Sequence, residues 1–197
     1  MAIIGGGDRK ASAGVKRPGG AYLYRLENGV WQEKQKLQSP QPNTNDLFGY
    51  SVAICGEQAF VGAVNTPVAG IFSAGAVYVY QWEKGVWQPQ QRLVPDNPQY
   101  CGFFGATIAI AKQKQFAIIG STRADSPRLR DTGGAYIFQL KKGEWQTTQK
   151  LQPNDLHYES YFGFSTPIDG QWIFVTAAWA NAPKFKRVGS IYVFECQ

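Results

Sequence analysis

One internal repeat runs through the whole chain and restricts the folds that it can adopt. The pair Phe-Gly begins at residues 48, 104 and 162, and a tryptophan after a glycine turn stands at residues 31, 87 and 145, so both markers are spaced by 56 and 58 residues. A tyrosine keeps the same register, and its four copies are Tyr22, Tyr78, Tyr136 and Tyr192. Because independent markers share one spacing, the sequence is built from copies of a single structural unit.

Each unit is predicted to contain four β-strands. In the second unit these strands cover residues 48–54, 59–63, 76–82 and 86–93. The first two and the last two strands are joined by short turns that contain glycine, which is typical of β-hairpins. The predicted fold class is therefore all-β, a β-propeller-type repeat with four blade units of four antiparallel strands. The alternative is a β-sandwich in which the repeat is a coincidence.

The four units cover residues 1–38, 48–94, 104–152 and 162–197 and form a single propeller or half-propeller domain. The first unit lacks its first strand and the last unit lacks its fourth. Three arrangements agree with this pattern: part of a longer propeller, a half-ring that pairs with a second copy, and a small closed ring. Pro167 is unusual because it falls within the first strand of the last unit, where proline cannot donate a hydrogen bond.

Several segments of the second unit resemble the FG-GAP repeat family, which also forms the propeller of integrin alpha subunits, and the bacterial form is the closest in pattern. The resemblance is carried by Phe48-Gly49, by residues 60–63 and 75–80, and by Trp87-Gln88 followed by Leu93. It implies a propeller that binds other proteins at an extracellular or cell-surface location, although propellers have many unrelated functions.

Many FG-GAP repeats hold calcium in an Asp-rich loop between their first two strands. The corresponding turns of this chain, at residues 55–58, 111–115 and 169–171, are short and contain few carboxylates. Calcium needs six or more oxygen ligands, so we predict no metal site there.

The sequence contains few residues that could carry out catalysis. Its one histidine, His157, stands alone in a predicted loop, and none of the common hydrolase, metalloprotease or phosphate-binding motifs occurs. We therefore predict that the chain is not an enzyme and that it has no catalytic residues and no cofactor. No apolar run reaches the roughly 18 residues that would span a membrane.

Three cysteines, Cys55, Cys101 and Cys196, are too widely spaced to form a disulfide framework. Either one disulfide bond and one thiol or three thiols would agree with the sequence.

Basic residues gather in the loops that join the second strand to the third. In a propeller, these loops share one face with the connections between units. The candidate binding residues on this face are Arg9, Lys10, Lys16, Arg17, Arg123, Arg128, Arg130, Trp179, Lys184, Lys186 and Arg187. The net charge is +6, so these loops either keep the protein in solution or bind an anionic partner.

These observations predict a non-enzymatic binding or scaffolding module that mediates protein–protein interaction or self-assembly. A second copy that completes the ring is one such partner. The alternative is a lectin-like module in which the loop face, with Trp179, binds acidic glycans. Nucleic-acid binding is not favoured, because no known nucleic-acid-binding motif is present.

Overall fold

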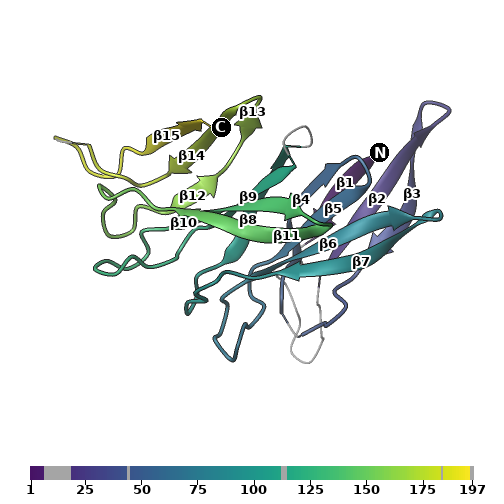
Figure 1. Ribbon diagram of the computed structural model, residues 1–197, viewed down its shortest axis with the longest axis horizontal. Coiled ribbons are helices and arrows are strands. Elements are labelled where there is room, and N and C mark those ends of the chain that lie inside the picture. The colour runs from purple at the N-terminus through teal and green to yellow at the C-terminus, as the bar shows by residue number, and fades with distance from the viewer. Residues whose placement is uncertain (7–18, 44, 112–114, 183, 196–197) are drawn as a thin grey trace.

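Four antiparallel β-sheets follow one another along the chain and lie side by side in a fan (Figure 1). The computed structural model describes residues 1–6, 19–43, 45–111, 115–182 and 184–195, and its regular elements are all strands. We call the sheets blades 1 to 4, from the N-terminal end of the fan to its C-terminal end. The prediction of an all-β, propeller-like repeat is confirmed.

The two middle blades each have four strands that pair in sequence order. Blade 2 contains β4 (Phe48–Cys55), β5 (Gln58–Ala63), β6 (Ala76–Glu83) and β7 (Val86–Leu93). Blade 3 contains β8 (Phe104–Ala111), β9 (Phe116–Ser121), β10 (Gly134–Lys141) and β11 (Glu144–Leu151). The predicted strands of the second unit differ from these by no more than one residue at either end.

The two outer blades are incomplete among the described residues, as the repeat predicted. Blade 1 has three strands, which are β1 (Ala2–Gly6), β2 (Gly20–Glu27) and β3 (Val30–Leu37). Blade 4 contains β12 (Phe162–Ser165), β13 (Ile168–Asp169), β14 (Trp172–Ala177) and β15 (Ser190–Glu195). Both β12 and β13 pair with β14, so together they form one interrupted first strand.

Pro167 lies in this interruption. A proline has no N–H to donate to the neighbouring strand, so it is confined to breaks, bulges and edges of sheets. Its carbonyl oxygen still accepts a hydrogen bond of 3.0 Å from the Phe174 N–H. The strand breaks around residues 166 and 167 and resumes at Ile168, which explains how the proline is accommodated.

The hydrophobic core consists of three clusters, each between two consecutive blades. The phenylalanine of each Phe-Gly pair is fully buried in one of them. Phe104, for example, contacts the rings of Tyr136 and Phe138 at centroid distances of 5.3 and 6.0 Å. Phe104 also shares its cluster with Phe60 and Val77 of blade 2, so the Phe-Gly repeat is a packing motif that joins each blade to the preceding one.

Glycines let the backbones of neighbouring blades approach closely. A Cβ atom at Gly62 would collide with the carbonyl oxygen of Gly105 in the next blade, and one at Gly120 would collide with that of Gly163. Blade 4 carries Thr176 at the position that corresponds to Gly62 and Gly120. The outward face of blade 4 therefore differs from those of blades 2 and 3 at this point.

Candidate functional site

Backbone hydrogen bonds connect the loops on one side of the fan across the blades. The N–H of Phe103 donates to Ser73, that of Tyr161 donates to Asp131, and that of Trp179 donates to Ser160, at 3.1 to 3.3 Å. We call this surface the loop face; its described part is formed by residues 64–75, 94–103, 122–133, 152–161 and 178–189.

The loop face contains seven of the predicted binding residues: Arg123, Arg128, Arg130, Trp179, Lys184, Lys186 and Arg187. The other four, Arg9, Lys10, Lys16 and Arg17, lie outside the described residues.

Three of the seven meet in a row of cations and aromatic rings. The Arg123 guanidinium lies 5.7 Å from the ring centroid of Phe103 and 5.8 Å from that of Tyr161. Tyr161 contacts Trp179 edge-on at 5.0 Å, and the Arg187 guanidinium lies 5.1 Å from the Trp179 ring. We call these five residues the cation–aromatic ladder; it joins the loops of blades 3 and 4.

Phe103 and Tyr161, which the sequence analysis missed, each stand directly before a Phe-Gly pair. Their φ angles are +54° and +52°, a left-handed conformation that is uncommon for non-glycine residues. This turn leaves their rings on the loop face, whereas the phenylalanine that follows is buried. The corresponding residue of blade 2 is Leu47. An aromatic residue before Phe-Gly was the available signal.

Both cations of the ladder are paired with carboxylates. Arg123 Nε lies 3.3 Å from Asp131 Oδ1, and Arg187 Nη2 donates to Glu159 Oε2 at 2.7 Å. Hydrogen bonding to Tyr161 raises the pKa of Arg123, and Asp131 raises it further. Burial raises the pKa of Asp131, while Arg123 opposes that shift. These arginines therefore hold the rings in place and add little free charge to the surface.

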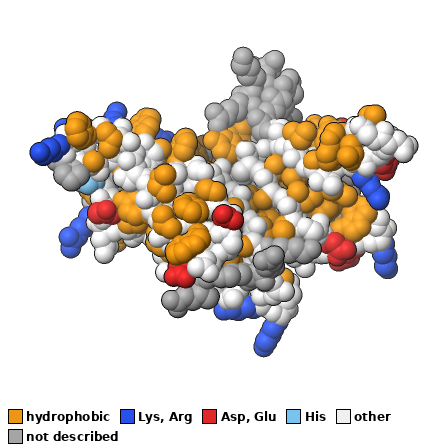
Figure 2. Space-filling model, turned by 90° about the horizontal axis from the view of Figure 1, so that it is seen from above, with side chains coloured by type: hydrophobic (Ala, Val, Ile, Leu, Met, Phe, Trp, Pro, Cys, Tyr) orange, Lys and Arg blue, Asp and Glu red, His pale blue; other side chains and the backbone are white. Residues whose placement is uncertain are grey.

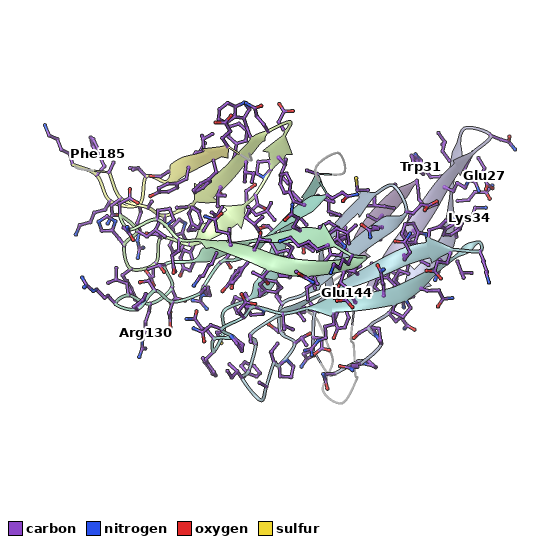
Figure 3. All side chains as sticks on the ribbon, viewed as in Figure 1. Glu27, Trp31, Lys34, Arg130, Glu144 and Phe185 are labelled. Atoms are coloured by element: carbon purple, nitrogen blue, oxygen red, sulfur yellow. The ribbon has the colours of Figure 1, made fainter. Side chains whose placement is uncertain are left out.

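The exposed positive charge comes from Arg128, Arg130, Lys184 and Lys186. All four are exposed, and none forms an ion pair with another described residue. Arg130 projects from the tip of its loop, and the exposed ring of Phe185 stands at the end of the fan (Figure 3). The loop face is therefore basic and partly aromatic, and only part of its positive charge is unpaired.

A shallow hollow of about 560 Å³ opens on the loop face beside Lys184 and Lys186. Asp155, His157 and Phe185 also line it. The backbone N–H of His157 donates to Ser160 Oγ at 2.8 Å, and this bond orders the loop. The hollow combines one carboxylate with two ammonium groups, which suits a small anionic group better than a cation.

The end blades expose hydrophobic side chains whose repeat partners are buried. On blade 1, Ile4 is 57% exposed and Trp31 is 51% exposed, and on blade 4 Ile191 is 67% exposed. The corresponding residues of the middle blades, such as Trp87 at 3%, lie between two sheets. Figure 2 shows hydrophobic side chains over both ends of the molecule. Exposed apolar area of this kind marks sites of association.

The described residues contain no group of three or more His, Cys, Asp or Glu side chains that could hold a metal ion. Cys55 and Cys101 are free thiols, and Cys196 lies outside the described residues. In the same part of the chain there is no helix of the length and apolarity needed to cross a membrane.

The profile of the FG-GAP repeat matches two segments of the chain, residues 31–80 and 145–194. These segments hold 50 residues each, and together they make up just over half of the 197 residues. No curated protein matches the chain.

Among solved structures, the chain is similar to the periplasmic gluconolactonase PpgL of Pseudomonas aeruginosa, with a TM-score of 0.54 and 14% sequence identity. The match covers 98% of this chain and 49% of the gluconolactonase chain, so the protein spans about half the length of that neighbour.

The gluconolactonase corrects one prediction from the sequence. We inferred that the chain is not an enzyme because its sequence contains few residues that could carry out catalysis. That inference is wrong, because an enzyme shares the fold over almost the whole of this chain. At 14% identity the likeness shows the fold alone and assigns no reaction to this protein.

Proposed function

The chain belongs to the FG-GAP repeat family, and we propose that it serves as a protein-binding propeller segment that assembles with a second copy of itself through its two end blades. The observation that carries this proposal is the exposure of Ile4, Trp31 and Ile191, whose repeat partners are all buried between blades. Leaving such side chains in water costs free energy, which association recovers.

The contacts between consecutive blades, which we call joints, indicate how the two ends of the fan would fit together. Between blades 2 and 3, one face supplies Phe60, Val77 and Val79, and the other supplies Ile119, Tyr136 and Trp145. The residues of blade 4 that correspond to the first set are Phe174, Ile191 and Val193. Those of blade 1 that correspond to the second set are Ile4, Tyr22 and Trp31. Each end thus carries one half of a joint of the same chemical type.

Thr176 supports blade 1 of another copy as the partner of blade 4. At the inner joints, the residue at this position must be glycine, because it faces a carbonyl oxygen in the first strand of the next blade. The described part of blade 1 has no such first strand. A threonine side chain is therefore tolerated at a joint between blade 4 and blade 1, whereas it would clash with a complete following blade.

The molecular mass in solution tests this proposal. We expect light scattering across a wide concentration range to give a mass above the 21.8 kDa of one chain, with a dimer at twice that value. Ile4→Glu and Ile191→Glu should each return the protein to a monomer, because they place a charge in the joint. Leu129→Glu, an exposed site on the loop face, is the control and should leave the mass unchanged. A monomeric wild-type protein at the highest concentration would refute the proposal.

A second candidate function is supported by the cation–aromatic ladder and the exposed cations beside it. Trp179 presents its ring between Tyr161 and Arg187, and Lys184 and Lys186 lie in the same loop. Such a surface suits an anionic partner, either an acidic protein segment or an acidic glycan.

Measured affinities for polyglutamate, as the acidic protein segment, and for heparin, as the acidic glycan, distinguish these two ligands. The double variant Lys184→Glu, Lys186→Glu should weaken both interactions, whereas Trp179→Ala should weaken only heparin binding if the ring packs on a sugar. The double variant Lys141→Glu, Lys142→Glu lies at the turn between β10 and β11, away from the loop face, and serves as the charge-matched control. Absence of any binding at low salt would exclude this candidate.

A further inference from the structure

The outer strands of blades 1 to 3 share the pattern Trp-Gln-x-x-Gln-Lys/Arg-Leu. It occupies residues 31–37, 87–93 and 145–151. The tryptophan, the second glutamine, the basic residue and the leucine make contacts that recur from blade to blade. The pattern therefore identifies the contacts that an outer strand makes with the rest of the fold.

The tryptophan and the second glutamine connect the outer strands of neighbouring blades. Gln35 Nε2 donates to the carbonyl oxygen of Trp87 at 2.9 Å, and its Oε1 accepts the N–H of Trp87 at 2.8 Å. Gln91 makes the same two bonds to Trp145, at 2.8 and 2.9 Å. The indoles of Trp87 and Trp145 are buried, and that of Trp145 packs edge-on against Phe60 of the preceding blade at 5.1 Å.

The basic residue and the leucine fix the strand to its own blade. The ammonium of Lys150 lies 5.7 Å from the ring centroid of Tyr136 on the adjacent strand, and Leu151 is buried. Lys36 and Tyr22 in blade 1, and Arg92 and Tyr78 in blade 2, form the same pair at 5.4 and 6.0 Å.

At the edge of blade 4 the residues that would make these contacts are present, but no outer strand among the described residues contacts them. Gln149 corresponds to Gln35 and Gln91, yet its side chain is exposed and forms no hydrogen bond to another described residue. Beside it, between blades 3 and 4, lies a cavity of about 840 Å³. Its lining includes Phe116, Ile137, Gln149, Leu151, Ile173 and Phe194.

The strand next to this cavity, β15, has one unpaired edge in the described structure, because it pairs with β14 alone. Tyr192 on β15 corresponds to Tyr22, Tyr78 and Tyr136, but no cation lies over its ring among the described residues. Instead its hydroxyl donates to Asp155 Oδ1 at 3.0 Å, which places a carboxylate where a basic side chain would arrive.

We propose that the edge of β15 and this cavity accept an extended strand from another protein, with the pattern Trp-Gln-x-x-Gln-Lys/Arg-Leu. The strand adds antiparallel to β15 and its indole enters the cavity. Gln149 bonds the N–H and carbonyl of that tryptophan, and the basic residue lies over Tyr192 beside Asp155. Main-chain pairing provides affinity and the side-chain sites provide selectivity, as in other cases of strand addition.

The strand β3 of a second copy is a poor source for this strand, although its sequence fits. Its Gln35 already holds the main chain of Trp87, and Leu37 is buried in the cluster between blades 1 and 2. Moving β3 to another molecule would break both contacts. A second copy would therefore lose contacts of its own by supplying this strand, and this inference does not depend on self-association of the end blades.

A fluorescein-labelled peptide with the sequence of residues 143–152 tests the acceptor by fluorescence anisotropy. We expect saturable binding to the full chain, and loss of binding when the tryptophan of the peptide is replaced by alanine. Gln149→Ala in the protein should weaken binding about tenfold, because two hydrogen bonds to the peptide are lost. Gln146→Ala, an exposed glutamine on the same strand, is the matched control and should bind the peptide as the wild type does.

Hydrogen exchange gives a second readout that does not depend on the label. Binding of the peptide should slow exchange of the β15 amides, residues 190–195, because an edge strand becomes paired. The inference is overturned if the peptide shows no saturable binding, if its alanine version binds equally well, or if Gln149→Ala and Gln146→Ala have the same effect. It is also overturned if the chain forms a dimer that Gln149→Ala dissociates, since a second copy would then be the occupant.

Discussion

Replacing Trp145 with alanine should destabilise the protein far more than the same change at Trp31. Trp145 is 3% exposed, and its ring packs edge-on against Phe60 at 5.1 Å. Truncating a buried tryptophan to alanine costs about 3–5 kcal/mol, and the aromatic pair accounts for about 1 kcal/mol of it. The indole Nε1 is buried without a hydrogen-bond partner, which already reduces the stability of the wild type. We therefore expect a loss near the lower limit, about 3 kcal/mol.

Urea denaturation followed by far-UV circular dichroism measures this loss, which corresponds to a fall in Tm of roughly 6–12 °C. Trp31→Ala is the matched control, because it is the same residue at the same position of the repeat but is 51% exposed. Its cost should stay below about 0.5 kcal/mol, as is usual at surface positions. Both variants should be measured at low protein concentration, so that association does not contribute. Equal losses for the two variants would refute the assignment of Trp145 to the joint between blades.

Two further predictions concern the joints and the dependence on pH. Gly120→Ala should lower the free energy of unfolding by roughly 1–3 kcal/mol, because the added Cβ collides with the carbonyl oxygen of Gly163. Thr176→Ala at the corresponding site should lower it by less than about 1 kcal/mol. Thermal melts compare the two variants, and equal losses of stability would contradict the close approach of the two backbones. Burial raises the pKa of Tyr136 to about 12, so its contribution to stability is complete below pH 10 and is lost as the pH rises toward 12. Tyr136→Phe should flatten this alkaline loss in melts recorded between pH 9 and 12, and an unchanged slope would contradict it.

Much of the fold could be predicted because the same pattern of strands and turns occurs in several units of the sequence. The strand at residues 86–93 was predicted with its observed bounds, since an alternating segment follows a glycine turn in three units. Burial of the Phe-Gly phenylalanines also follows from the repeat, because a large apolar residue at one register in each copy must fill an equivalent space. Patterns of this kind depend on local sequence and on period alone.

The candidate site could be predicted only in part, because its contacts join residues from different blades. The sequence placed Arg123, Trp179 and Arg187 on one face and Asp131 in the same loop as Arg123, but it gave no sign that Glu159 pairs with Arg187. Glu159 and Arg187 lie in two different loops, one that enters blade 4 and one within it, and the spacing of charges along the chain does not encode their meeting.

Comparison of equivalent positions in different blades identifies where contacts are incomplete, because the same residue occurs both with and without a neighbouring sheet. Trp87 and Trp145 are buried and Trp31 is exposed. The side chains of Gln35 and Gln91 are hydrogen-bonded to the next blade, and the side chain of Gln149 forms no hydrogen bond to a described residue. In each pair of cases the residue type and the local strand are the same, so local preference cannot explain the difference. The difference lies in the neighbouring sheet, which is missing beside Trp31 and incomplete beside Gln149 among the described strands. Both sites retain the chemistry of a joint, which is why we expect them to bind protein.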